Sequence, residues 1–155
     1  QRGPKGEPPL FTDFTYDNLG VPRNPANPFY GQDKAHNPDG QRFVDRGLGA
    51  AVNKPAEDGK FKVPTLRNIA RTAPYMHNGY FTTLRGAVAF YNDRDVRKRC
   101  PKYLPEAEAN RRKCWPAPEV AANVNTDELG RLGLSEREVD DIVAFLRTLD
   151  DGYKP

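Results

Sequence analysis

The chain has 155 residues, which is the size of one domain and long enough to bury a core. Its 24 Lys and Arg residues are interspersed with 21 Asp and Glu residues, so no basic stripe indicates nucleic acid, and no apolar run approaches the roughly 18 residues of a membrane-spanning helix. Only 37% of the residues are hydrophobic, whereas 13 are glycine and 15 are proline. The apolar content is low for a self-sufficient globule, and a loop-rich domain wrapped around a large apolar cofactor would account for it.

The part of the chain before residue 60 contains no strong helix. The first residues, QRGPKGEPP, have neither the charged n-region nor the apolar h-region of a signal peptide. The segment from Leu10 to Tyr30 is rich in aromatic residues and proline, and its rings are expected to be buried, either by loop packing or along a cofactor. His36, in the turn-rich sequence AHNPDG, is predicted to lie at the surface. Residues 39–52 are a weak helix candidate, because Gly47 and Gly49 lower the helix propensity.

A clear helix is predicted after residue 82. Thr82 is the expected N-cap, because its hydroxyl can accept a hydrogen bond from an early backbone N–H. Leu84, Ala87, Val88 and Tyr91 follow at positions i, i+3, i+4 and i+7 and therefore share one apolar face. The phenol of Tyr91 should point at whatever this face covers.

The sequence before this helix is predicted to be irregular. Pro64 and Pro74 fix the backbone and remove donors, so residues 65–72 can form at most a short helix. The next four residues, Met76-His77-Asn78-Gly79, are typical of a turn that places a thioether and an imidazole side by side.

Cys100 and Cys114 are the only cysteines, and neither has a C-x-x-C partner or a nearby histidine, which argues against a metal site. A disulfide between them would contribute on the order of 3 kcal/mol and would indicate an oxidising compartment. Two buried free thiols are the alternative. Between the cysteines, PEAEANRR (residues 105–112) predicts a short polar helix with Pro105 at its first position.

The last predicted helix begins after Ser135, which forms a capping box with Glu138. Apolar residues then recur at helical spacing, and Gly152 is expected to stop the helix. These apolar residues are Val139, Ile142, Val143, Leu146 and Leu149. The expected fold is mainly α, with long ordered loops.

One long motif is recognisable. FKVPTLRNIARTAPYMHNG, followed by a helix that begins Thr-Leu, resembles the C-terminal haem domain of bacterial di-haem cytochrome c peroxidases and their MauG-type relatives. The resemblance extends more loosely from LFTDFTYDNLGVPRNP at Leu10 to the last helix, which is similar to the terminal helix of class I cytochromes c. It implies one class I cytochrome c-like haem domain over residues 1–155, the C-terminal domain of a two-domain di-haem protein. The C-x-x-C-H motif that attaches haem c is absent, so we expect this motif and an N-terminal haem domain upstream of Gln1.

If that motif supplies the proximal histidine, this chain is expected to supply the other axial ligand. Three side chains could bind iron: Met76 as a soft thioether, His77 through a ring nitrogen, and Tyr91 as a phenolate. The resemblance favours Tyr91, whose position matches the axial methionine of the peroxidases and the iron-binding tyrosine of MauG-type members. Met76 is the alternative ligand, although its position is often filled by phenylalanine in the family. A core tyrosine without a ligand role is the other interpretation of Tyr91.

The resemblance also implies contacts with haem propionates and with calcium. Arg67 is the candidate propionate partner, because a guanidinium can pair two carboxylate oxygens, although a helix-surface arginine is the competing interpretation. The family binds calcium between its haem domains through backbone oxygens at positions that match Thr72 and Pro74, with a side-chain ligand from the other domain.

The resemblance implies a periplasmic di-haem c-type oxidoreductase that reduces hydrogen peroxide with electrons passed through this haem domain. A tyrosine at position 91 shifts the expectation toward MauG-type chemistry. The expected partners are the upstream haem domain, a redox protein as electron donor and hydrogen peroxide, and a homodimer is left open. Two alternatives are an electron-transfer cytochrome c without peroxidase activity and a haemless, disulfide-stapled binding module.

Overall fold

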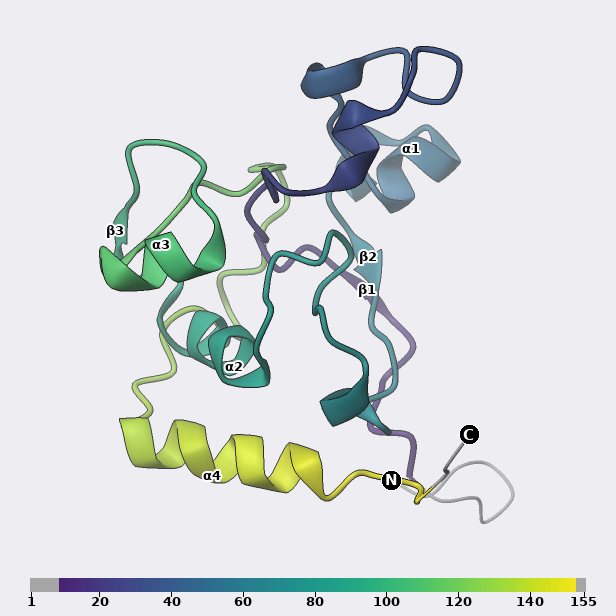
Figure 1. Cartoon of the computed structure of the whole chain (residues 1–155). Helices are drawn as coiled ribbons and strands as arrows, with labels where there is room; N and C mark the ends of the chain where they lie inside the picture. Colours follow the sequence, from purple (N-terminus) through teal and green to yellow (C-terminus); the bar gives the residue numbers. More distant parts are fainter. Residues whose placement is uncertain (1–8, 153–155) are drawn as a thin grey trace.

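The computed structural model describes residues 9–152, so the prediction about the first residues of the N-terminus lies outside the described residues. Within this range the regular elements are short and long loops connect them (Figure 1). The helices are α1 (Leu48–Val52), α2 (Leu84–Asp93), α3 (Glu106–Arg111) and α4 (Glu136–Arg147), and the strands are β1 (Tyr16–Asp17), β2 (Phe61–Lys62), β3 (Lys98–Arg99) and β4 (Cys114–Trp115). Four 3-10 turns cover Pro28–Gly31, Gly40–Arg42, Pro55–Glu57 and Ile69–Arg71.

The strands form two minimal ladders. β1 pairs with β2 in antiparallel register, with Tyr16 opposite Lys62, and β3 pairs with β4 in parallel register, with Lys98 opposite Cys114. The expected long loops are therefore present, and helices exceed strands. The expected mainly α class holds only in part, because most of the described residues belong to neither kind of element.

Helix α2 is the central element, and its first turn is capped from two directions. Thr83, not the predicted Thr82, is the N-cap, and its hydroxyl accepts from the Gly86 N–H at 3.0 Å. Thr82 is engaged by Glu106 of α3, whose carboxylate accepts from both its N–H and its hydroxyl. The prediction was wrong by one residue because a distant carboxylate competes for Thr82.

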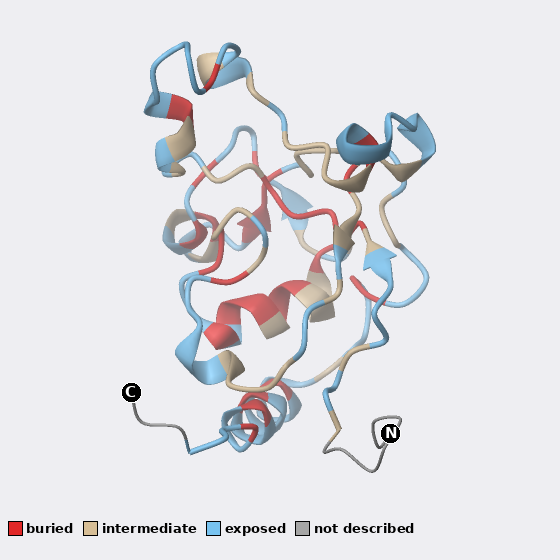
Figure 2. Ribbon diagram, turned by 90° about the vertical axis from the view of Figure 1, so that its right-hand side faces the viewer, coloured by how far each residue is buried: buried red, intermediate tan, exposed pale blue. Residues whose placement is uncertain are grey.

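One side of α2 packs on an aromatic cluster. Phe81, Phe90 and Trp115 are fully buried, with ring centroids 5.0 to 5.8 Å apart in tilted or edge-to-face arrangements, which aromatic pairs favour. The Trp115 indole N–H donates to Asp93 Oδ1 at 2.7 Å, so the polar atom of this buried ring is satisfied. In Figure 2 the buried residues gather on α2 and on the segments around it.

Helix α4 packs across α2 rather than alongside it (Figures 1 and 2). Its capping box is present as predicted, with the Ser135 hydroxyl accepting from the Glu138 N–H and the Glu138 carboxylate accepting from the Ser135 N–H. Val139, Val143 and Leu146 are buried, as the spacing predicted, whereas Ile142 of the same series is exposed. The helix ends at Arg147 with Thr148 as C-cap, so the expected stop at Gly152 is wrong.

Of three other local predictions, two were wrong and one was correct. Residues 39–52 do not form one helix: a 3-10 turn at Gly40–Arg42 and the five-residue α1 stand there instead. Pro105 is the N-cap of α3 rather than its first helical residue. Residues 65–72 contain only the 3-10 turn Ile69–Arg71, which agrees with the predicted limit.

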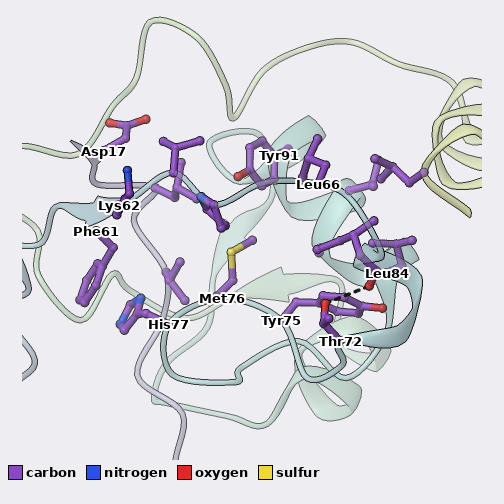
Figure 3. Close-up of a pocket in the computed structure, with 18 of the residues that line it drawn as sticks. Asp17, Phe61, Lys62, Leu66, Thr72, Tyr75, Met76, His77, Leu84 and Tyr91 are labelled. Atoms are coloured by element: carbon purple, nitrogen blue, oxygen red, sulfur yellow. Dashed lines mark hydrogen bonds between the residues drawn. The ribbon is translucent and has the colours of Figure 1, made fainter. Parts of the chain in front are cut away.

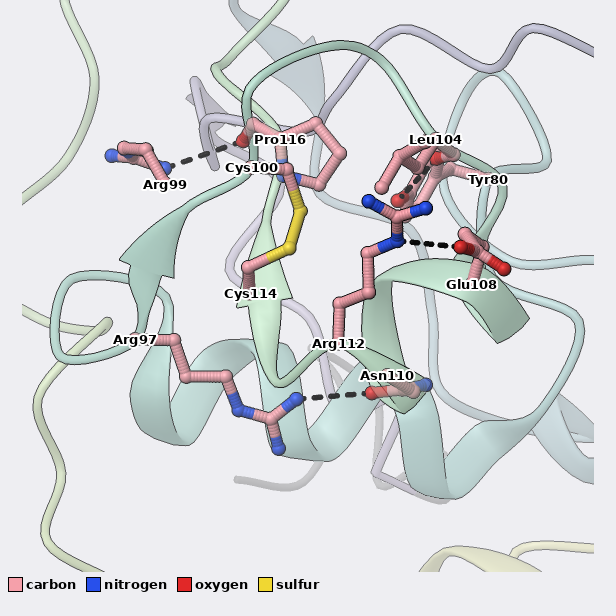
Figure 4. Close-up of a disulfide and its surroundings, with 10 residues drawn as sticks. All are labelled: Tyr80, Arg97, Arg99, Cys100, Leu104, Glu108, Asn110, Arg112, Cys114 and Pro116. Atoms are coloured by element: carbon pink, nitrogen blue, oxygen red, sulfur yellow. Dashed lines mark hydrogen bonds and ion pairs between the residues drawn. A yellow bond between two sulfur atoms is a disulfide. The ribbon is translucent and has the colours of Figure 1, made fainter.

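The predicted disulfide is present between Cys100 and Cys114 (Figure 4). It closes the lobe that carries α3, and Cys100 N–H also donates to the Trp115 carbonyl at 2.9 Å. Cys114 and Trp115 are both buried, so the disulfide anchors this lobe beside the aromatic cluster. The surface prediction for His36 is also confirmed: its side chain is 70% exposed and its Nδ1 lies 2.9 Å from Asp33.

Candidate functional site

A mostly apolar cavity of about 800 Å³ lies between α2, α4, the β1–β2 ladder and the irregular segment before α2 (Figure 3). This volume is within the range of roughly 300–1,000 Å³ that is usual for cofactor and ligand sites. Every candidate site residue named from the sequence contributes to its lining. These residues are Arg67, Thr72, Pro74, Met76, His77 and Tyr91.

The cavity face of α2 is the predicted apolar stripe. Leu84, Ala87, Val88 and Tyr91 all line the cavity, while Phe90 of the same helix faces the aromatic cluster. The 3.6-residue period of the helix therefore separates a cavity side from a core side. The small side chain of Ala87 leaves room on the cavity side for a flat ligand.

The opposite wall is made by the predicted turn at residues 76–79. The Gly79 N–H donates to the Met76 carbonyl at 3.2 Å, and Asn24 donates to the carbonyls of Asn78 and Gly79 at 2.9 and 3.1 Å. Gly79 has a φ of +66°, and a Cβ at this position would lie 3.1 Å from Pro74 Cγ. A glycine is therefore required here, and the turn holds the Met76 side chain toward the cavity (Figure 3).

His77 stands at the edge of the cavity and is stacked on Phe61. The two rings are nearly parallel, at 6°, with centroids 3.5 Å apart. Desolvation by its neighbours lowers the pKa of His77 to about 4 although the residue is partly exposed, and the Asp45 carboxylate acts in the opposite direction. A neutral imidazole fixed against an aromatic ring forms one side of the cavity, and the stacking sets the orientation of its ring plane.

Tyr91 lies deeper in the cavity, on α2. Burial and, to a smaller extent, the negative charge of Asp17 raise the pKa of its phenol to about 12. Within the protein alone the phenol is thus protonated at neutral pH. Figure 3 shows Tyr91 and Met76 reaching into the same space from opposite walls.

The three residues expected to contact a haem propionate or calcium are half-buried or exposed. Arg67 lines the cavity, but its guanidinium forms an ion pair with Asp151, so a propionate would have to share or displace that carboxylate. Thr72 and Pro74 are exposed and line the cavity together. Among the described residues, no group of three or more His, Cys, Asp or Glu side chains could hold a metal ion. The calcium prediction concerns backbone oxygens and remains a prediction.

Over 149 residues the chain is 45% identical to the methylamine utilization protein MauG of Paracoccus denitrificans, an alignment that covers 94% of this chain and 36% of that protein. It is 33% identical over 153 residues to the cytochrome-c peroxidase IdrP1 of Denitromonas iodatirespirans, covering 91% of this chain and 34% of that protein. The chain belongs to the family of MauG and the di-haem cytochrome c peroxidases. No protein-family model matches it.

Solved structures of the MauG and peroxidase family have the same fold. The diheme peroxidase BthA from Burkholderia thailandensis superposes with a TM-score of 0.65 at 34% identity, over 92% of this chain and 35% of that chain. A MauG-like protein associated with microbial copper homeostasis superposes with a TM-score of 0.60 at 26% identity, over 90% of this chain and 35% of that chain. The chain spans about a third of the length of these relatives, and it corresponds to their C-terminal part.

The structure adds cavity residues that the sequence analysis missed. Asp17, Lys62 and Glu119 come from three separate segments and all line the cavity. Asp17 and Lys62 lie on paired strands, so a correct β1–β2 assignment could have brought them together. Nothing in the sequence indicated Glu119, which follows a proline-rich stretch with no periodicity.

Proposed function

We propose that this chain is the C-terminal, class I cytochrome c-like haem domain of a di-haem oxidoreductase that uses hydrogen peroxide, with residues 1–155 as one domain. The observation that carries the proposal is the meeting of Tyr91 and Met76 in one apolar cavity of about 800 Å³, in a chain 45% identical to MauG. The function of the relatives belongs to proteins about three times as long, so it is proposed for a longer protein that contains this chain.

The residues present fit a haem. The cavity is mostly apolar and large enough for a macrocycle, and the small side chain of Ala87 leaves room beside α2. It offers a phenol and a thioether as axial donors, and cationic side chains at Lys62 and Arg67 for the propionates. The 155 residues contain no C-x-x-C-H motif, so in this proposal the attachment cysteines and the proximal histidine come from the rest of the longer protein.

Haem c, when bound, supplies one-electron chemistry, and the chain's own residues set its environment. Tyr91 would hold the iron of a bound haem through its phenol oxygen, with Met76 as the alternative donor. The α2 stripe excludes water from one face of the cavity, and the 76–79 turn closes the other. His77, held against Phe61, would pack at the cofactor edge.

The remaining assignments concern the whole protein. Support for a periplasmic location is the disulfide, which forms in oxidising compartments, together with the family itself. No helix within residues 9–152 is long and apolar enough to cross a membrane. A calcium ion held partly by the carbonyls of Thr72 and Pro74, an upstream haem domain and a redox protein as electron donor complete the proposal.

Two measurements on the complete protein test this function. Pyridine haemochrome analysis should show two c-type haems per chain; a colourless, folded protein would support the haemless binding module instead. A hydrogen peroxide turnover assay with a reduced cytochrome or cupredoxin as donor then decides between enzyme and carrier. Reduction of peroxide at no more than the rate without protein would support an electron-transfer cytochrome.

A further inference from the structure

Glu119 is a carboxyl group enclosed between two cavities. Its side chain is 4% exposed, and it lines both the main cavity and a smaller one of about 170 Å³. Its Oε1 atom accepts a hydrogen bond from the Tyr30 hydroxyl at 3.2 Å. No donor of the described residues makes a hydrogen bond of normal geometry to its buried Oε2 atom, although the nearby Asn78 side chain favours the ionised form. An ionised carboxylate with an unpaired, buried oxygen is costly, so this site favours a carboxyl group that carries a proton at Oε2.

The groups around Glu119 act on the ionisation of its carboxyl group in opposite directions. Arg23 Nη1 is 4.0 Å from Oε1, but the same guanidinium also donates to the Phe43 carbonyl at 2.9 Å and lies over the Tyr30 ring. Asp45, across the smaller cavity, opposes ionisation. Burial and Asp45 raise the pKa of Glu119, while Tyr30, Arg23 and the Asn78 amide act against them, and burial has the largest effect.

The smaller cavity lies beside Glu119, and several residues of its lining are half-buried. Its lining is largely polar or aromatic and includes Tyr30, Asp45, Asn78 and the ring of His77, which also borders the main cavity. Asn27 and Asp45 of this lining are half-buried and reach toward the surface. A cavity of about 170 Å³ has room for ordered water, and the side chains of Asp45, Asn78 and Glu119 offer it hydrogen-bond partners.

We propose that Glu119 is a proton-exchanging group coupled to the oxidation state of the haem in the main cavity, and that the smaller cavity is the route of its proton to solvent. The inference rests on the proposed function, because without a haem the main cavity undergoes no change of charge. Glu119 acts through the field of its carboxyl group and is a positioning residue rather than a ligand.

The charges balance in this coupling. When one electron leaves the main cavity toward the upstream haem domain, the cavity gains one positive charge. The O–H bond of Glu119 then breaks, the electron pair stays on Oε2, and the proton passes through the smaller cavity to solvent. Re-reduction by the electron donor reverses both changes. The enclosed region keeps the same net charge, which matters because charges in a low-dielectric interior interact strongly.

The test is a spectroelectrochemical titration of the complete, haem-loaded protein across a pH series. In the wild type the midpoint potential of this domain's haem should fall with rising pH over one window. In Glu119→Gln, which keeps the shape but cannot ionise, the dependence in that window should be lost. Glu136→Gln is the matched control: its side chain is 83% exposed, and it should behave as the wild type. A redox-difference infrared spectrum should show a carboxylic acid carbonyl band that is absent only in Glu119→Gln.

A second variant keeps the proposal testable if Glu119→Gln does not fold. Tyr30→Phe removes the hydroxyl that stabilises ionised Glu119, so the window should move to higher pH without disappearing. A wild-type slope in Glu119→Gln, or an unmoved window in Tyr30→Phe, would overturn the proposal. The haemochrome spectrum separates this result from failure of the proposed function: a protein without haem refutes the function, whereas a haem protein with unchanged pH dependence refutes only the role of Glu119.

Discussion

The carboxylate of Glu106 accepts hydrogen bonds from both the backbone N–H and the hydroxyl of Thr82, at 2.6 and 2.7 Å. Its other oxygen accepts from the Thr83 hydroxyl at 3.2 Å. An acidic group at the start of a helix satisfies free N–H groups and interacts well with the helix dipole. Glu106 lies inside the loop closed by the disulfide, so this loop supplies a cap for α2, the helix that carries Tyr91.

Replacing Glu106 with alanine should lower the free energy of unfolding by about 2–3 kcal/mol, because charge-assisted hydrogen bonds from a buried carboxylate are lost and donors at the start of α2 are left without it. Chemical denaturation of the complete protein measures this loss. Glu108→Ala, on the same helix, removes a carboxylate that pairs with the exposed Arg111 and Arg112 and should cost less than about 1 kcal/mol. Equal losses in the two variants would contradict the capping role.

Removing the disulfide with Cys100→Ser and Cys114→Ser should lower stability by about 3 kcal/mol on the chain-entropy estimate for a loop of this length. The haem spectrum should be retained at low temperature, because neither cysteine lines the main cavity. Thiol titration of the denatured, unreduced wild type should find neither Cys100 nor Cys114 free. Two titratable thiols from this domain would show that the bond does not form in the protein.

Arg94 is fully buried, and the carboxylate of Asp95 is its counter-charge. Its Nε donates to Asp95 Oδ1 at 2.9 Å, and its other nitrogens donate to the carbonyls of Leu19 and Asn125 at 2.8 and 2.7 Å. The hydrogen bond from Arg94 holds the pKa of Asp95 below its ordinary value of 3.8. Because the folded-state pKa is depressed, this contribution to stability is complete above about pH 3.8 and is lost as the pH falls through the folded-state value.

Asp95→Asn should therefore destabilise the protein by on the order of 3 kcal/mol at neutral pH, since it leaves the buried guanidinium without its counter-charge. The difference in free energy of unfolding between wild type and variant should become smaller as the pH falls below the ordinary pKa range of a carboxyl group. Denaturation midpoints at neutral and acidic pH provide the comparison. A gap that stays constant with pH would show that the loss comes from packing rather than from the charge.

Local patterns predicted the parts of the site that lie within one element. The 3.6-residue period placed Leu84, Ala87, Val88 and Tyr91 on one face, and that face does line the cavity. The turn at residues 76–79 and the Ser135 capping box follow in the same way from residues that are neighbours in sequence. Such interactions depend on a few successive residues, so a single sequence contains the information for them.

Errors occurred where distant residues compete. Thr82 resembles a good N-cap, but Glu106, 24 residues away, takes its hydrogen bonds and the cap moves to Thr83. Glu119 could not be identified because its partner Tyr30 is 89 residues away, in a short 3-10 turn, and Glu119 itself lies in an irregular segment. Pairings of this kind are set by the tertiary fold, and no periodicity of either segment reports them.

The last prediction concerns the axial ligand. Tyr91→Phe keeps the aromatic ring on the cavity face of α2 but removes the side-chain oxygen that could bind iron. A phenolate favours ferric iron, so the variant should show an altered visible spectrum and a raised midpoint potential for this haem. The Tyr91 hydroxyl has no hydrogen bond among those found within residues 9–152, so stability should change by less than about 1 kcal/mol.

Met76→Leu is the matched variant for the competing assignment. Met76 reaches into the same cavity from the opposite wall and packs against the core, and leucine preserves most of its volume without the sulfur (Figure 3). If Tyr91 is the ligand, Met76→Leu should leave the spectrum and potential almost unchanged. Loss of a ligand band in Met76→Leu with no change in Tyr91→Phe would reverse the assignment, because only the residue bound to iron can alter its electronic spectrum so selectively. Electron paramagnetic resonance of the ferric protein distinguishes the two ligand sets independently of absorbance.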